Sequence, residues 1–146
     1  MITYKLDFPN IIRISEDREV VYTISKKHRG HNKKKSYWSI KMPREIALFR
    51  TALQNGYEDK TNNVAWNLNI VNGVICIVGH AVDKKELKLA KFVDSNHNEK
   101  WHGYPADYIK NSQDRPSAKV LELWNNAGII STATMKKIKG GQPCNL

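Results

Sequence analysis

Apolar and polar side chains alternate most clearly between residues 63 and 78, and strict alternation is the pattern of a half-buried β-strand. Asn72-Gly73 lies in the middle of this stretch, and such a pair is preferred in a two-residue hairpin turn because both positions need positive φ. We therefore predict a β-hairpin over residues 63–78. Every residue from 74 to 78 is apolar, so this second half should be a central strand that is covered on both faces.

The first forty residues show the β pattern in shorter pieces. Apolar residues alternate in 2–6 and again in 12–14. Residues 20–24 and 36–40 are rich in β-branched and aromatic side chains, which favour strands. We predict that 20–24 and 36–40 pair as a second hairpin, with the segment 26–35 as its long tip.

One helix is expected over residues 43–55. Pro43 suits the first helical position, because its missing N–H would have no intrahelical partner there. Apolar residues then recur at helical spacing as far as Leu53. Gly56 follows as the stop, since glycine readily adopts the left-handed conformation that ends a helix.

The stretch 83–93 carries two competing patterns. Asp83 and Glu86 are placed as the two members of a capping box, which favours a helix with Leu89 and Phe92 on its buried side. Alternating leucines in the same stretch also fit a strand. We predict the helix, followed by a loop over 94–115 that is dense in polar and aromatic groups.

The C-terminal part has the pattern of a helix pair over residues 116–127 and 132–139. Gly128 ends the first helix, Ser131 caps the second, and lysines crowd its last turn, where the helix dipole favours cations. Together these elements predict an α+β fold in a single domain over residues 1–146. A mostly antiparallel sheet would be packed by one central helix and the C-terminal helix pair.

Composition narrows the setting. The chain has 146 residues, 40% hydrophobic and 26% charged, which is typical of a globular domain. No apolar run approaches the ~20 residues that span a bilayer, and the first residues lack the basic and apolar regions of a secretory signal. Cys76 and Cys144 follow no spacing motif. We expect a cytoplasmic protein with no membrane partner and no cofactor.

Charge is the unusual quantity, because 24 Lys and Arg face 14 Asp and Glu, a net charge of +10. The ten residues 26–35 hold six cations and no acid, and Tyr37 and Trp38 follow. Cations neutralise phosphates and aromatic rings stack on bases, so we predict RNA or DNA binding by this segment, with stacking or catalytic groups from the aromatic and histidine-containing loop 97–115 beside it. The six cations are Lys26, Lys27, Arg29, Lys33, Lys34 and Lys35.

The loop 94–115 suggests a different function, that of a small metal-independent ribonuclease of the kind used as a toxin. His102 titrates near neutral pH and could serve as acid or base, with Asp107 orienting it. Tyr104 and Arg115 could stabilise charge on a phosphoryl group. The same aromatic groups could instead simply anchor a long loop.

The basic residues also fit functions that need no nucleic acid. The segment 26–35 could dock on an acidic protein, as an inhibitor or antitoxin would, or be a solvated tip that keeps the protein soluble. The C-terminal helix pair has the outline of a helix-turn-helix, although its second helix is short. The histidines match no zinc spacing with further ligands nearby, so no metal site is predicted. No glycine-rich phosphate loop occurs in the sequence.

Overall fold

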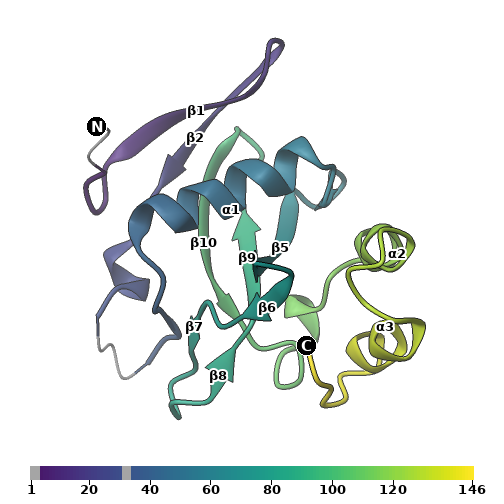
Figure 1. Cartoon of the computed structure of the whole chain (residues 1–146). Helices are drawn as coiled ribbons and strands as arrows, with labels where there is room; N and C mark the ends of the chain where they lie inside the picture. The colour runs from purple at the N-terminus through teal and green to yellow at the C-terminus, as the bar shows by residue number, and fades with distance from the viewer. Residues whose placement is uncertain (1–3, 31–33) are drawn as a thin grey trace.

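The computed structural model describes residues 4–30 and 34–146 and confirms the α+β class, with three α-helices packed on β-sheets (Figure 1). The helices are α1 (Met42–Gln54), α2 (Ala118–Asn126) and α3 (Thr132–Lys139), with short 3-10 helices η1 (Lys26–His28) and η2 (Ser112–Asp114). The strands are β1 (Pro9–Ser15), β2 (Arg18–Thr23), β3 (Tyr37–Trp38), β4 (Glu58–Asp59), β5 (Val64–Val71), β6 (Val74–Cys76), β7 (Gly79–His80), β8 (Glu86–Leu87), β9 (Leu89–Val93) and β10 (Lys100–Ala106).

The main sheet has seven strands in the order β1-β2-β10-β9-β5-β4, with β6 paired to β5. Among the strands of the described residues, neighbours run antiparallel except β2 and β10, which pair in parallel where Lys100 and Trp101 lie beside Val21 and Tyr22. A second sheet of three short strands has the order β3-β7-β8. The predicted, mostly antiparallel sheet is therefore confirmed.

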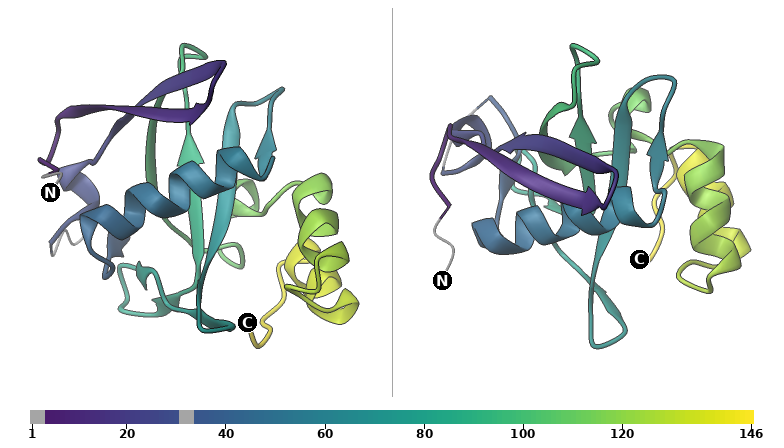
Figure 2. Two further views of the ribbon diagram at one scale, coloured as in Figure 1. Left: turned by 45° about the horizontal axis from the view of Figure 1, so that its top comes forward. Right: turned by 90° about the horizontal axis from the view of Figure 1, so that it is seen from above.

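Helix α1 covers one face of the main sheet, and Figures 1 and 2 show it crossing the strands. Its buried side chains include Ile46 and Phe49, which join a core with Tyr22, Phe92 and Trp101. Burial of these large side chains supplies most of the driving force that fixes α1 on the sheet.

Helices α2 and α3 lie at the other end of the molecule and pack on a second core (Figure 1). This core contains Trp66 and Leu68 from β5 and Trp124 and Ile138 from the helices. Ser117 caps α2, so the helix begins just after the predicted start at Pro116, and Ser131 caps α3 as predicted. Both hydroxyls accept a hydrogen bond from a backbone N–H in the first turn, which is the role of an N-cap residue.

The predicted hairpin over 63–78 is present, with Asn72 and Gly73 at positive φ between β5 and β6. The central strand, however, is its first half rather than its second. Val74 is 60% exposed, whereas the polar side of β5 is buried under α1. Asn67 can be buried there because its Nδ2 donates to the carbonyl of Leu48, 2.9 Å away, which offsets the cost of burying an amide.

The helix predicted over 83–93 is wrong, because this stretch forms strands β8 and β9. Strand β9 lies between β5 and β10 and is buried on both sides. The capping residues favour a helix in this stretch, but burial of β9 in the sheet stabilises the strand more, so the strand forms.

The loop predicted over 94–115 is wrong for residues 100–106, which form β10. Gly103 and Pro105 interrupt the strand pattern in the sequence, and both have a structural reason. A Cβ at Gly103 would lie 2.4 Å from the Phe92 ring, so only glycine allows this close packing. Pro105 lies beyond the point where β2 pairs with β10, where its missing N–H costs no ladder bond on that side.

The hairpin predicted from 20–24 and 36–40 is also wrong. Strand β2 pairs with β1 and β10 in the main sheet, whereas β3 pairs with β7 in the small sheet. The segment 26–35 therefore connects two sheets and begins with η1. Within it, η1 lies against β3 and β10 instead of projecting from the body of the protein.

Candidate nucleic-acid interface

The beginning of the basic segment lies directly on β10. The imidazole of His28, in η1, stacks on the ring of Tyr104, with 5.3 Å between ring centroids and 22° between ring planes. This contact follows from the parallel pairing, because β2 runs beside β10 and continues into η1. Two regions that are more than seventy residues apart in sequence thus form one surface.

Two hydrogen bonds fix the position of His28. Its Nδ1 lies 2.8 Å from the carbonyl oxygen of Ser36, and the Ser36 hydroxyl donates to the carbonyl of Pro105 over 2.8 Å. A carbonyl oxygen can only accept, so Nδ1 carries the proton. In the neutral ring, Nε2 therefore holds the lone pair, which can accept a proton or a hydrogen bond.

His102 is half-buried on the same side of β10 as Tyr104, since residues two apart on a strand share a face. Burial lowers the pKa of His102, and the nearby charge of Lys27 lowers it further, although the Asp94 carboxylate acts in the opposite direction. Burial also lowers the pKa of His28, against the hydrogen bond to Ser36, and the charges of Lys35, His102 and Lys27 add to this. Both histidines are therefore mainly neutral at pH 7.

Tyr104 is supported from behind by a buried ion pair. Its hydroxyl donates to Oδ1 of Asp114 over 2.9 Å, and Nζ of Lys91 donates to the same oxygen over 3.1 Å. The Lys91 ammonium also lies 5.6 Å from the Tyr104 ring centroid. Burial and the Asp114 carboxylate raise the pKa of Tyr104, so this hydroxyl stays protonated and the ring is a rigid support for His28.

Lys27 and Lys35 supply the positive charge around the two histidines. Both are exposed, and within the described ranges neither forms an ion pair with a carboxylate. Lys26 is different, because its Nζ lies 3.9 Å from Oδ2 of Asp7. The pair is exposed and contributes little to the stability of the fold. Two exposed cations without a carboxylate partner among the described residues thus lie beside His28 and His102.

Three further residues of the predicted nucleic-acid site have partners outside this surface. Arg29 turns inward, where its guanidinium pairs with the fully buried Glu45. Trp38 is 5% exposed and stacks on Phe92 in the core. Tyr37 is half-buried and stacks on the ring of His80. Lys34 is exposed, and Lys33 lies outside the described residues.

Asp107 and Arg115 do not join His102 and Tyr104. The Asp107 carboxylate accepts from the backbone N–H groups of Ile109 and Lys110 and from Nζ of Lys85, so it organises the turn after β10. Arg115 donates through Nε to the carbonyl of Tyr108 over 2.9 Å. These contacts give both residues a structural role just after the C-terminal end of β10.

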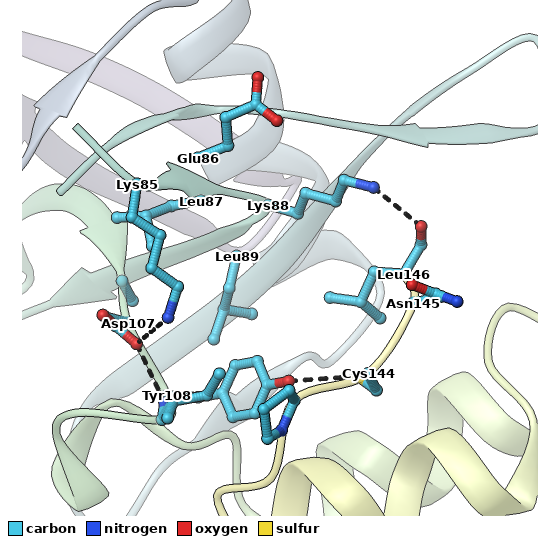
Figure 3. A pocket seen from close by; sticks show the side chains of 13 residues that line it. Lys85, Glu86, Leu87, Lys88, Leu89, Asp107, Tyr108, Cys144, Asn145 and Leu146 are labelled. Carbon is cyan, nitrogen blue, oxygen red and sulfur yellow. Dashed lines mark hydrogen bonds and ion pairs between the residues drawn. The ribbon is translucent and has the colours of Figure 1, made fainter.

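Asp107 also borders a pocket of about 240 Å³ between β8, the turn after β10 and the C-terminal tail (Figure 3). Leu87 and Leu89 form part of its apolar wall. The Tyr108 hydroxyl donates to the Gln142 carbonyl over 2.9 Å and lies 3.2 Å from Sγ of Cys144. Burial raises the pKa of Tyr108, and its hydroxyl holds the tail in place, so the pocket is a product of tail packing.

His28 is the residue of this surface that sequence reasoning did not place in the candidate site. Within the sequence it is one member of a basic run, and nothing in its spacing points to Tyr104 or His102. The signal would have been the pairing of β2 with β10. That pairing is parallel and between distant segments, which local sequence patterns do not reveal.

No family model, curated protein or solved structure matches this chain. Over residues 4–30 and 34–146, no group of three or more His, Cys, Asp or Glu side chains is arranged to hold a metal ion. In the same part of the chain, no helix has the length and apolar character needed to cross a membrane.

Proposed function

We propose that this protein binds single-stranded nucleic acid, RNA or DNA, at the surface formed by η1 and β10. The observation that carries the proposal is the stacking of His28 on Tyr104, because it brings the exposed lysines of the basic segment beside a half-exposed ring and two polar imidazoles. Proteins that bind single strands combine a cationic track along the backbone with aromatic faces for the bases.

The charge distribution supports a polyanion as the ligand. Lys27 and Lys35 lower the pKa of the histidines beside them. Their positive charges therefore act on the surface that contains His28 and His102. Self-repulsion of this kind is relieved when phosphate binds and counterions are released. Two free thiols, Cys76 and Cys144, are in keeping with the reducing cytoplasm that we propose as the location.

The proposal predicts a salt-dependent affinity that depends on these two lysines. For a short RNA or DNA single strand, the variant Lys27→Gln/Lys35→Gln should bind about tenfold more weakly at low salt. The slope of log affinity against log salt should become shallower by about 1.4, since each phosphate contact on a single strand contributes about 0.7. Fluorescence anisotropy across a salt series measures both quantities.

The matched control is Lys136→Gln/Lys137→Gln in α3, which removes the same charge from exposed positions at the other end of the molecule (Figure 1). This variant should keep the affinity and the slope of the original chain. An equal loss of affinity in both variants would show that binding depends only on the net charge of the protein, and this result would contradict the proposed surface. Binding of an acidic protein with no binding of nucleic acid would instead favour a function as an inhibitor or antitoxin-like partner.

A further inference from the structure

We infer that this surface cleaves RNA, with His28 as general base and His102 as general acid on either side of one phosphodiester. The inference rests on the proposed nucleic-acid binding and adds a reaction to it. Its geometric basis is that His28 stacks on Tyr104, while His102 lies two residues earlier on the same face of β10. Residues two apart on a strand are separated by about 7 Å, so His102 is a neighbour of the Tyr104 ring on which His28 stacks, and the two imidazoles are close enough to influence each other electrostatically. A phosphodiester group bound at this surface can contact both.

His28 is arranged as the base. Its Nδ1–H is held by the Ser36 carbonyl, so the lone pair of Nε2 is on the opposite side of the ring and available to a substrate hydroxyl. Ser36 is itself tied to β10 through the carbonyl of Pro105. The ring is thus locked in tautomer and orientation before substrate arrives, which is the preorganisation that proton transfer needs.

His102 is arranged as the acid, because its electrostatic surroundings differ from those of His28. The charges that act on His28 are those of Lys35 and Lys27, together with that of His102 when it is protonated. His102 is influenced by Lys27 on one side and by the Asp94 carboxylate on the other. The carboxylate favours the protonated imidazole, and no carboxylate of the described residues is among the charges that act on His28, so we assign the role of proton donor to His102.

Lys27 is available to stabilise the phosphate, since it is exposed, precedes His28 in η1 and carries a charge that acts on both histidines. A cation there would attract the scissile phosphate and offset the negative charge that grows on it during the reaction. Tyr104 is a positioning residue. Its ring supports His28, and its hydroxyl is occupied by Asp114.

The reaction is a transesterification within the RNA strand. Nε2 of His28 takes the proton of a ribose 2′-hydroxyl, and the 2′-oxygen forms a bond to the adjacent phosphorus. The bond from phosphorus to the 5′-oxygen breaks as protonated His102 gives its proton to that oxygen. The products are a 2′,3′-cyclic phosphate and a free 5′-hydroxyl, and no external reactant is consumed.

The pH dependence follows from the same surroundings. For cleavage, His28 must be neutral and His102 protonated. Burial and neighbouring lysines lower the pKa of both histidines below the ordinary value of 6.5. The Ser36 hydrogen bond opposes this shift at His28, and the Asp94 carboxylate opposes it at His102. The kcat/KM for cleavage should therefore pass through a maximum below pH 6.5. It should fall at higher pH as His102 loses its proton and at lower pH as His28 gains one.

The experiment follows a labelled RNA oligonucleotide with the purified protein at pH 5 to 8, and mass spectrometry identifies the ends formed. His28→Gln and His102→Gln should each lower the cleavage rate about 100-fold or more, in line with the usual contribution of an acid or base. His97→Asn is the matched control: His97 is exposed and has positive φ, a conformation that asparagine tolerates. It should cleave at the original rate, and thermal unfolding verifies that every variant is folded.

An all-2′-deoxy strand of the same sequence separates cleavage from binding. We expect it to bind and remain intact, because it lacks the attacking hydroxyl. RNA that binds but is not cleaved would overturn this inference and leave the proposed binding standing. Absence of binding to either strand would overturn both. Cleavage that persists in His28→Gln and His102→Gln would identify a contaminating nuclease and likewise overturn the inference.

Discussion

Replacing Lys91 with methionine is expected to lower the free energy of unfolding by about 3–5 kcal/mol, because it leaves a buried carboxylate without its counter-charge. The side chains of Lys91 and Asp114 are 7% and 5% exposed, and their charged atoms are 3.1 Å apart. Asp114 would keep hydrogen bonds from Tyr104 and Asn111, but neither carries a positive charge. Urea unfolding followed by tryptophan fluorescence measures the loss.

The control for this substitution is Lys85→Met. Lys85 pairs with Asp107, but its side chain is 42% exposed, so its loss should cost less than about 1 kcal/mol. Adding Asp114→Asn to Lys91→Met should restore part of the stability, since the unpaired charge is then removed. Equal losses for Lys91→Met and Lys85→Met would contradict the structural role assigned to the pair behind Tyr104.

Replacing Arg29 with methionine is expected to destabilise the protein strongly at pH 8 and much less at pH 5. Glu45 is fully buried and accepts hydrogen bonds from Arg29 and Tyr22. Burial raises the pKa of Glu45 above its ordinary value of 4.5, although the bonds from Tyr22 and Arg29 act against this. Without the guanidinium that pKa rises further, and the ionised form becomes costly, by about 3–5 kcal/mol for a broken buried pair.

The direction with pH follows from linkage. A carboxyl whose folded pKa is raised contributes its stability below the unfolded pKa and loses it as pH rises through the folded pKa. The Arg29→Met protein should therefore lose stability between pH 5 and pH 8 more steeply than the original chain. Arg13→Met is the control, because the Arg13–Glu19 pair is exposed on both sides, and its cost should be small. A penalty for Arg29→Met that does not change with pH would contradict the account of Glu45.

Local sequence signals predict the three α-helices that form in the described part of the chain and the turn of the central hairpin. Pro43 marks a helix start because its ring fixes φ and its missing N–H needs no partner in the first turn. Ser131 marks another through a hydrogen bond from Thr134, three residues along the chain. Asn72-Gly73 specifies its turn for the same reason, since the pair tolerates positive φ. These features depend on residues within one turn of each other and can therefore be predicted without the fold.

The features that sequence missed depend on contacts between distant segments. Strand β10 contains Gly103 and Pro105, which indicate a break in the strand until their contacts with Phe92 and Ser36 are known. In the sequence the basic segment resembles a flexible cationic arm, because its charges can be read there. Its contacts with β10 and α1 cannot be read from the sequence. Arg29 has a buried partner in Glu45, and that partner lies in another element.

Some of the residues predicted for the candidate site lie together in the structure, and others do not. His102 and Tyr104 lie on the proposed surface, and so do the lysines near them, because clustered charge and titratable groups are visible in sequence. Asp107 and Arg115 instead hold the turn after β10 and the segment that follows it. Their proximity to His102 in sequence does not become proximity in space, since a strand carries successive residues away from one another.

The most direct test of the composite surface is an NMR titration of the histidine ring protons with an all-2′-deoxy oligonucleotide at low salt. If the phosphates bind between η1 and β10, their negative charge should raise the pKa of both His28 and His102, while the resonances of the exposed His97 stay in place. Binding of the oligonucleotide without any change at His28 and His102 would show that the ligand sits elsewhere and would contradict the account.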